Sequence, residues 1–140
     1  MALASLTSIT PAAAQQENMI DTIKSRGKLQ VGFSSFVPWA MRDKQGQWVG
    51  FEIDVAGKLA KDMGVQLELI PTAWDGIIPS LIAKKFDVII GGMSVTPARQ
   101  EQIDFTVPYS NSGQGVVAST ALASKLKWPD DYNNSNVTLT

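Results

Sequence analysis

The stretch DVIIGGMSVTPARQEQIDFTVPY, residues 87–109, combines the signals of a buried strand, a glycine turn and the start of a helix. The apolar run at 88–90 is typical of a buried strand, and the glycine pair after it allows the backbone to turn and to approach a ligand closely. Thr96 is a predicted N-cap, and Pro97 suits the first helical position because proline has no N–H to leave unpaired. The stretch therefore predicts a strand, turn and helix with an open strand end.

Arg99 falls in the first turn of this predicted helix, where the helix dipole disfavours a cation. Free backbone N–H groups, the hydroxyls of Ser94 and Thr96, and the guanidinium together offer the donors that a small carboxylate ligand needs. The alternative is an ordinary surface ion pair between Arg99 and Glu101 or Asp104. The spacing of the residues leaves both interpretations open.

The composition of the chain excludes several classes of function. Its 140 residues, 44% hydrophobic, suffice for one domain with a core. The 12 basic and 13 acidic residues give a net charge of -1 without a basic tract, so nucleic-acid binding has no electrostatic support. The lack of cysteine and histidine excludes a thiol-based role, a histidine-based catalytic triad and a zinc site with those ligands.

The first 16 residues differ from the rest of the chain because they are small, mildly apolar and uncharged. The run Ala12-Ala13-Ala14 before Gln15 resembles a signal-peptidase cleavage site, although no positive residue precedes it. We therefore predict that residues 1–14 are the remnant of a signal peptide. The alternative is a disordered N-terminus.

Strand and helix signals alternate along the rest of the chain. Strands are predicted at 29–33, 65–70, 88–90, 103–105 and 116–118, a hairpin at 39–49, and helices at 17–26, 50–63 and 76–85. Such alternation indicates an α/β fold with a mainly parallel sheet flanked by helices and right-handed crossovers.

Three acidic residues lie at predicted helix starts. Asp75 is a predicted N-cap, and Glu52 and Asp54 complement the dipole in the first turn of their helix. Two acids two positions apart do not face each other on a helix. We therefore interpret Glu52 and Asp54 as helix-start residues, not as catalytic carboxylates.

Aromatic side chains follow two of the predicted strands. Phe36 lies in the loop after strand 29–33, and Trp74 comes directly after strand 65–70. The carboxyl ends of parallel strands share one edge of a sheet, where ligands bind in open α/β folds. Trp74 is either a lid on the core or a stacking wall for a ligand, whereas core packing is the favoured interpretation of Trp39.

Three motifs in order carry a resemblance to a known family: GFSSFVPWAMRDKQGQWVGFEIDVAGKLAKDMG, WDGIIPSLIAKKFDVIIGGMSVTPARQEQIDFTVPY and SNSGQGVVAS. Over residues 28–119 the sequence resembles the bacterial extracellular solute-binding proteins of family 3, the type II periplasmic binding proteins of amino-acid ABC transporters. The resemblance implies a periplasmic binding module without catalysis or cofactor. Its partners would be a small amino acid and an ABC permease, and the full-length protein is expected to be a monomer.

The resemblance also implies roles for individual residues. Phe36 and Trp74 match aromatic positions that flank the ligand side chain, and the carbonyl of Gly92 matches the acceptor of the ligand ammonium. Ser94 matches a hydroxyl position that holds both charged ends, and Arg99 matches the arginine that grips the α-carboxylate. The expected ligand-binding residues are Phe36, Trp74, Gly92, Met93, Ser94 and Arg99.

The sequence departs from the family in its length. Members have two lobes that close on the ligand, whereas this chain ends at Thr140, about where the first strand of the second lobe is expected. We interpret residues 15–119 as the first ligand-binding lobe and residues 120–140 as the crossover toward a second lobe. A single lobe is expected to bind amino acids weakly and to expose an apolar patch where a returning segment docks.

Two other functions remain open at this point. The same fold hosts dehydratases of cyclic carboxylic acids, which need a positioned acid or base near Arg99. The module is also used as the extracellular sensor of receptors with an output domain.

Overall fold

The computed structural model describes residues 18–113, 115, 117, 119–125 and 127. The chain divides between Phe105 and Thr106 into two units, which are described separately. The second unit contains the short helix α5 (Thr120–Ala123). The predicted strand at 116–118 and the predicted signal-peptide remnant at 1–14 lie, wholly or in part, outside the described residues.

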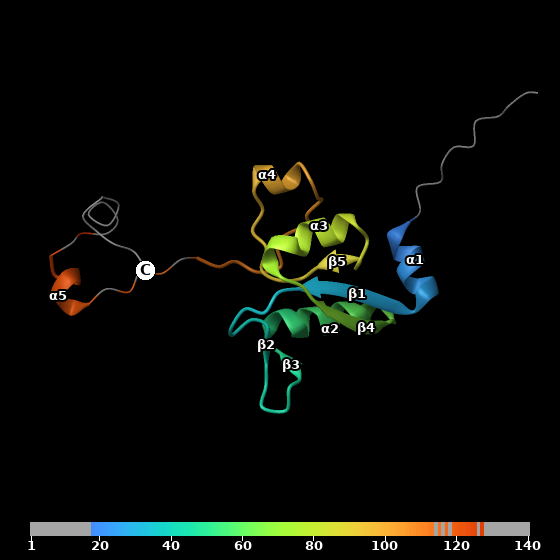
Figure 1. Cartoon of the computed structure of the whole chain (residues 1–140), viewed down its shortest axis with the longest axis horizontal. Helices are drawn as coiled ribbons and strands as arrows, with labels where there is room; N and C mark the ends of the chain where they lie inside the picture. The colour runs from blue at the N-terminus through green and yellow to red at the C-terminus, as the bar shows by residue number, and fades with distance from the viewer. Residues whose placement is uncertain (1–17, 114, 116, 118, 126, 128–140) are drawn as a thin grey trace, which may run out of the picture. The chain divides into compact units, whose positions relative to one another are not determined.

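A three-stranded parallel sheet forms the centre of the first unit (Figure 1). β1 (Lys28–Phe33) lies between β4 (Gln66–Pro71) and β5 (Val88–Ile89), with Val31 opposite both Leu69 and Val88. The predicted parallel α/β arrangement is thereby confirmed. Because the strands are parallel, the loops that follow them all leave from the same edge of the sheet.

A two-stranded hairpin follows the first loop, as predicted. β2 (Met41–Arg42) pairs with the antiparallel β3 (Trp48–Val49), and the carboxylate of Asp43 accepts two backbone N–H groups within the turn. The ring of Trp48 packs edge-on against Phe33 with 4.7 Å between centroids. This contact docks the hairpin onto the carboxyl end of β1.

Two helices end where the sequence predicts. α1 (Met19–Arg26) and α2 (Phe51–Met63) both end at a glycine with φ of 71°, Gly27 and Gly64. Glycine favours this left-handed conformation because it lacks a Cβ, and its N–H then bonds the last helical carbonyls. At the other end of α1, the side chain of Asn18 accepts the N–H of Ile20.

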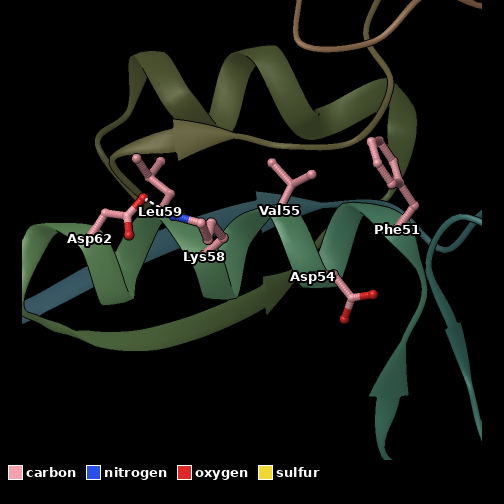
Figure 2. A pocket seen from close by; sticks show the side chains of 6 residues that line it. All are labelled: Phe51, Asp54, Val55, Lys58, Leu59 and Asp62. Atoms are coloured by element: carbon pink, nitrogen blue, oxygen red, sulfur yellow. Dashed lines mark hydrogen bonds and ion pairs between the residues drawn. The ribbon is translucent and has the colours of Figure 1, made fainter.

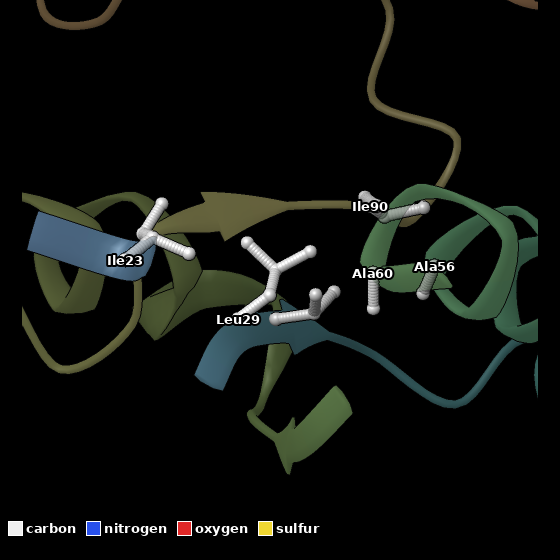
Figure 3. Close-up of a cluster of buried hydrophobic side chains, with 6 residues drawn as sticks. Ile23, Leu29, Ala56, Ala60 and Ile90 are labelled. Atoms are coloured by element: carbon white, nitrogen blue, oxygen red, sulfur yellow. The ribbon is translucent and has the colours of Figure 1, made fainter. Parts of the chain in front are cut away.

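The main core lies between one face of the sheet and the helices α1 and α2 (Figure 3). Alternate residues of a strand point to opposite faces, so Leu29 and Val31 of β1 face the helices together. The cluster of buried residues consists of Ile23, Leu29, Val31, Ala56, Ala60 and Ile90. Alanine at both α2 positions lets the helix approach the sheet closely.

The opposite face of β1 carries the helix α3 (Ile77–Ile82), whose Ile77 is buried. Gly32 lies directly under the ring of Phe86, and a Cβ on Gly32 would stand 2.4 Å from that ring. The strand therefore needs a residue without a side chain at this position. Together the two faces give a sheet covered by α2 on one side and α3 on the other (Figure 1).

An ion pair with a buried carboxylate connects several elements at the amino-terminal edge of the sheet. The carboxylate of Asp87, with 6% of its side chain exposed, accepts from the guanidinium of Arg26 and from the backbone N–H of Gln30. The same guanidinium donates to the carbonyl of Lys28. Asp87 thereby joins the start of β5 to β1 and to the end of α1.

Several details of the sequence-based prediction are wrong. Residues 103–105 form no strand, because the N–H of Ile103 continues the helical pattern by donating to the carbonyl of Arg99. Asp75 is no N-cap, because it lies inside a 3₁₀ turn, η1 (Trp74–Gly76), and α3 then begins without a side-chain cap. That helix ends at Ile82 instead of residue 85.

The buried faces of the helices are narrower than their apolar patterns predict. Leu59 of α2 is 38% exposed and Ile82 of α3 is 59% exposed, although both match the helical period. Among the described residues, no helix has the length and apolarity needed to cross a bilayer.

Candidate ligand-binding site

Three loops meet at the carboxyl edge of the sheet: residues 34–40 after β1, 72–76 after β4, and 90–96 after β5. The hydroxyl of Ser34 donates to the carbonyl of Thr72 at 2.6 Å, and the N–H of Thr72 donates to the carbonyl of Phe33 at 2.8 Å. A Cβ on Gly91 would stand 3.8 Å from the nitrogen of Ser34. The first loop therefore contacts both of the others.

The loop after β1 is closed on itself and presents Phe36. The backbone N–H and C=O groups of Phe36 and Ala40 bond each other at 2.8 and 2.7 Å, and the Val37–Pro38 peptide between them is cis. The side chain of Phe36 is 62% exposed. Because its backbone is fixed by two hydrogen bonds, the exposed ring stands on a defined loop.

Trp39 departs from its predicted place in the core. It is 37% exposed and packs edge-on against Phe51, with 5.9 Å between the ring centroids. Phe51 begins α2, so this contact joins the first loop to the start of that helix.

Arg99 lies on the short helix α4 (Pro97–Gln100), whose start has the predicted form. Thr96 is the N-cap, with its hydroxyl 3.4 Å from the nitrogen of Arg99, and Pro97 occupies the first turn. The guanidinium Nη1 donates to the carbonyl of Ser94 at 2.8 Å, so the side chain folds back over the loop. Within the described residues the alternative ion pairs with Glu101 and Asp104 are not formed.

Trp74 stands beside this guanidinium. The Cζ of Arg99 lies 5.6 Å from the centroid of the Trp74 ring, within the range of a cation–π interaction. Trp74 is 42% exposed, so the ring is not a lid over the core. The two side chains come from different loops and form one surface with a flat apolar part and a cationic part.

Gly92 supplies the turn between β5 and Arg99. Its φ of 63° lies in the left-handed region, which glycine adopts without strain. A Cβ at this position would stand 3.2 Å from Oε1 of Glu52. Met93 is half-buried and Ser94 is exposed, so the backbone of the loop runs along the surface beside Arg99.

Glu52 is the residue at this site that the sequence-based interpretation missed. It lies in the first turn of α2 as predicted, but only 5% of it is exposed. Its Oε1 lies against the turn at Gly92, which is far away in the sequence, so no local spacing marks this residue. The sequence shows only an acid in the first turn of a helix, which does not distinguish a buried side chain from an exposed one.

The structure brings Trp74, Gly92, Ser94 and Arg99 into one connected group, with Met93 inside the same loop. Phe36 stands on the adjoining loop, and within the described residues its ring is not stacked on that of Trp74. The arrangement offers a guanidinium fork, exposed aromatic surface and a glycine-rich backbone. Such groups suit a small ligand with a carboxylate and a side chain that packs on aromatic surface.

A separate groove of about 390 Å³ lies on α2, away from these residues (Figure 2). Phe51, Val55 and Leu59 give it apolar walls, and Lys58 and Asp62 form an ion pair of 2.5 Å at its rim. None of the expected ligand-binding residues lines it. An apolar surface suits packing against protein better than binding a zwitterion. It agrees with the expected apolar patch, and docking of a returning segment there stays a prediction.

Comparison with known proteins places the chain among extracellular binding proteins. The family described as bacterial extracellular solute-binding proteins, family 3, matches residues 29–128. The L-cystine-binding protein TcyJ of Escherichia coli K12 is 32% identical over 138 residues, which are 98% of this chain and 52% of TcyJ. The octopine-binding periplasmic protein of Rhizobium meliloti is 43% identical over 122 residues, 86% of this chain and 39% of that protein.

An enzyme is also among the relatives. The cyclohexadienyl dehydratase of Pseudomonas aeruginosa is 29% identical over 139 residues, which are 98% of this chain and 52% of the enzyme. The chain thus spans about half the length, or less, of the curated relatives that it matches.

Solved structures show the same architecture. An ancestral cationic amino acid solute-binding protein, AncCDT-1, is 44% identical with a TM-score of 0.71, covering 79% of this chain and 48% of that one. The arginine-bound form of domain 1 from TmArgBP is 46% identical with a TM-score of 0.65, covering 68% of this chain and 76% of the domain. The fold is therefore that of a type II periplasmic-binding-protein lobe.

Proposed function

The chain belongs to the bacterial extracellular solute-binding proteins of family 3, and from that premise we propose that it binds a polar L-amino acid in the periplasm for an ABC transporter. Arg99 binds the α-carboxylate, the backbone carbonyl of Gly92 receives the α-ammonium, and Ser94 holds both charged ends. Phe36, Met93 and Trp74 surround the side chain of the ligand. An ABC permease of the inner membrane takes the ligand from the closed protein.

The state of Arg99 is the observation that carries this proposal. The guanidinium has five N–H donors, and the contact that the structure gives it is a neutral backbone carbonyl, that of Ser94. It lies beside an exposed tryptophan ring, and the nearby acids Glu101 and Asp104 do not neutralise it. A planar guanidinium fits a carboxylate with two parallel hydrogen bonds, which a lysine does not provide.

The names of the relatives support an amino-acid ligand. They specify L-cystine and octopine, and the related solved domain contains arginine. That domain is described as domain 1 alone with arginine bound, which supports a ligand site formed within one lobe. We propose that residues 15–119 form such a lobe and that residues 120–140 lead toward a second one, with residues 1–14 left from an export signal.

The second candidate function is dehydration of a cyclic carboxylic acid, because a dehydratase is 29% identical over nearly the whole chain. In that case Arg99 holds the substrate carboxylate and a nearby acid transfers the proton. Among the curated relatives, those of higher identity than this dehydratase are named as binding proteins, which favours binding. A solved ancestral cyclohexadienyl dehydratase, 47% identical over 65% of this chain, supports the second candidate.

The test is a binding screen on the purified chain. Thermal shift followed by isothermal titration calorimetry measures the affinity for the common L-amino acids, cystine and octopine. We expect one or a few of them to bind, and Arg99→Ala to weaken binding at least about 100-fold because it removes a charged bidentate contact. If no amino acid binds, the proposal is wrong, and cyclic carboxylic acids are then tested for turnover.

A matched control is available on the hairpin. Arg42 also lies over a tryptophan ring, 4.2 Å from the centroid of Trp48, but belongs to β2 away from the loops. Arg42→Ala removes a similar cation–π contact and is expected to leave ligand affinity unchanged. An equal loss of ligand affinity in Arg42→Ala and Arg99→Ala would contradict a specific role of Arg99.

A further inference from the structure

We propose that Glu52 is a positioning residue, which holds the Gly92 turn in the conformation that receives the ligand ammonium. This inference rests on the proposed function. Its basis is a junction where the start of α2 meets both the loop after β1 and the loop after β5.

The side chain of Glu52 lies against the backbone of the Gly92 turn. Its Oε1 is 3.2 Å from the position that a Cβ on Gly92 would occupy. Only 5% of Glu52 is exposed, although ionisable side chains are seldom so buried. The carboxylate therefore fills the space behind the turn where a side chain would otherwise lie, and it supports a φ of 63° from outside the loop.

The backbone of the same residue is fixed to the first loop. The N–H of Glu52 donates to the carbonyl of Trp39 at 3.0 Å. Gly50 approaches that carbonyl so closely that a Cβ on it would stand 2.3 Å from the oxygen. The rings of Phe51 and Trp39 add an edge-on contact. Residues 50–52 are thus held on the first loop while Glu52 reaches the third.

Under this proposal, Arg99 and Glu52 act on opposite ends of the ligand. Arg99 holds the carboxylate end through its own side chain, whose guanidinium donates to the carbonyl of Ser94. Glu52 acts on the turn at Gly92, which serves the ammonium end. Loss of Glu52 should therefore weaken ligands that carry an α-ammonium and spare ligands that lack it.

The experiment compares two probes, L-arginine and its deaminated analogue, in which a hydrogen replaces the α-ammonium. The measured quantity is the ratio of the two dissociation constants from calorimetry. We expect Glu52→Ala to lower the preference for L-arginine at least about tenfold, because the turn loses its support. Affinity for the deaminated analogue should change by less than about threefold.

Two further variants separate shape from charge. Glu52→Asp keeps the charge but is too short to reach Gly92, so it should lower the preference as Glu52→Ala does. Glu52→Gln keeps the shape and should retain the preference within about threefold. The positioning role is wrong if Glu52→Gln lowers the preference for L-arginine as much as Glu52→Ala does. It is also wrong if Glu52→Ala weakens the affinity for both probes equally.

Asp54→Ala is the matched control, because Asp54 shares the first turn of α2 but is exposed. It should leave both affinities unchanged. Wild-type binding that Arg99→Ala abolishes but Glu52→Ala and Glu52→Asp do not alter would overturn this inference alone. Absence of binding by the wild type in the amino-acid screen would overturn the proposed function and this inference together.

Discussion

Two arginines stand at opposite edges of the same sheet, and their surroundings differ in one respect. At the amino-terminal edge, Arg26 is paired with the buried carboxylate of Asp87 and with the carbonyl of Lys28. At the carboxyl edge, Arg99 has the carbonyl of Ser94 and the face of Trp74. The fold supplies a counter-charge to the first arginine, whereas we propose that a ligand supplies one to the second.

The contrast separates structural from functional use of one side chain. A buried carboxylate needs its partners, because an ion without them loses its hydration and gains nothing in return. Arg26 and Asp87 therefore contribute to the stability of the sheet. Arg99 stays close to solvent, where its charge is tolerated and where we propose that a ligand carboxylate binds.

Removing the ion pair of Arg26 and Asp87 should lower the stability of the fold without changing the ligand affinity of the proposed site. Asp87→Ala leaves the N–H of Gln30 without its acceptor and Arg26 without its counter-charge. We expect the free energy of unfolding to fall by about 2–3 kcal/mol, while ligand affinity of the folded protein stays the same. Urea unfolding and calorimetry measure the two effects.

The control is an exposed ion pair on α2. Asp62 pairs with Lys58 at 2.5 Å, but 57% of its side chain is exposed. Asp62→Ala should cost less than about 0.5 kcal/mol because exposed pairs contribute little. The structural role of Asp87 is contradicted if the two variants have equal stability.

A conservative exchange at both arginines sharpens the comparison. Arg99→Lys keeps the charge but loses the planar fork, so ligand affinity should fall about tenfold, or about 1.4 kcal/mol. Arg26→Lys should leave affinity unchanged, because Arg26 lies at the other edge of the sheet. Calorimetry on the two variants gives the result, and an equal affinity in Arg99→Lys and wild type would argue against a bidentate contact.

The smallest effect is expected from the caps of two helices, one at each edge. Thr96→Ala removes the cap of α4, which carries Arg99, and should cost about 0.5–1 kcal/mol of stability and about threefold in affinity. Asn18→Ala removes the cap of α1 and should cost similar stability without any loss of affinity. Thermal unfolding and calorimetry measure both, and a loss of affinity in Asn18→Ala would show that the two edges are coupled.

The features predicted correctly from the sequence are those encoded by neighbouring residues. Gly27 and Gly64 end helices because the left-handed conformation is local to each glycine. Thr96 and Pro97 begin α4 for a similarly local reason. The parallel order of the sheet follows from the alternation of elements, since each crossover places the next strand in the same direction.

The features that were missed depend on how the loops fold, which short sequence patterns do not specify. Glu52 is buried with its Oε1 against the distant Gly92 turn, and its position at a helix start gives no sign of that. Asp75 matches the pattern of an N-cap, but a 3₁₀ turn takes up the residues before α3. The guanidinium of Arg99 donates to a backbone carbonyl and is not paired with either of the two acids of suitable spacing. The sequence left both partners open, because the choice between them depends on how the loop folds.

Because Arg99 lies beside Trp74, the fluorescence of this tryptophan should respond to changes at the site. Indole emission is sensitive to a charged group at the ring face, and a ligand carboxylate that draws the guanidinium aside changes that environment. The chain contains four tryptophans, so replacing Trp39, Trp48 and Trp128 by phenylalanine leaves one emitter at the ligand edge. Under the proposed function, the fluorescence of the protein itself then reports free amino acid, with no dye attached.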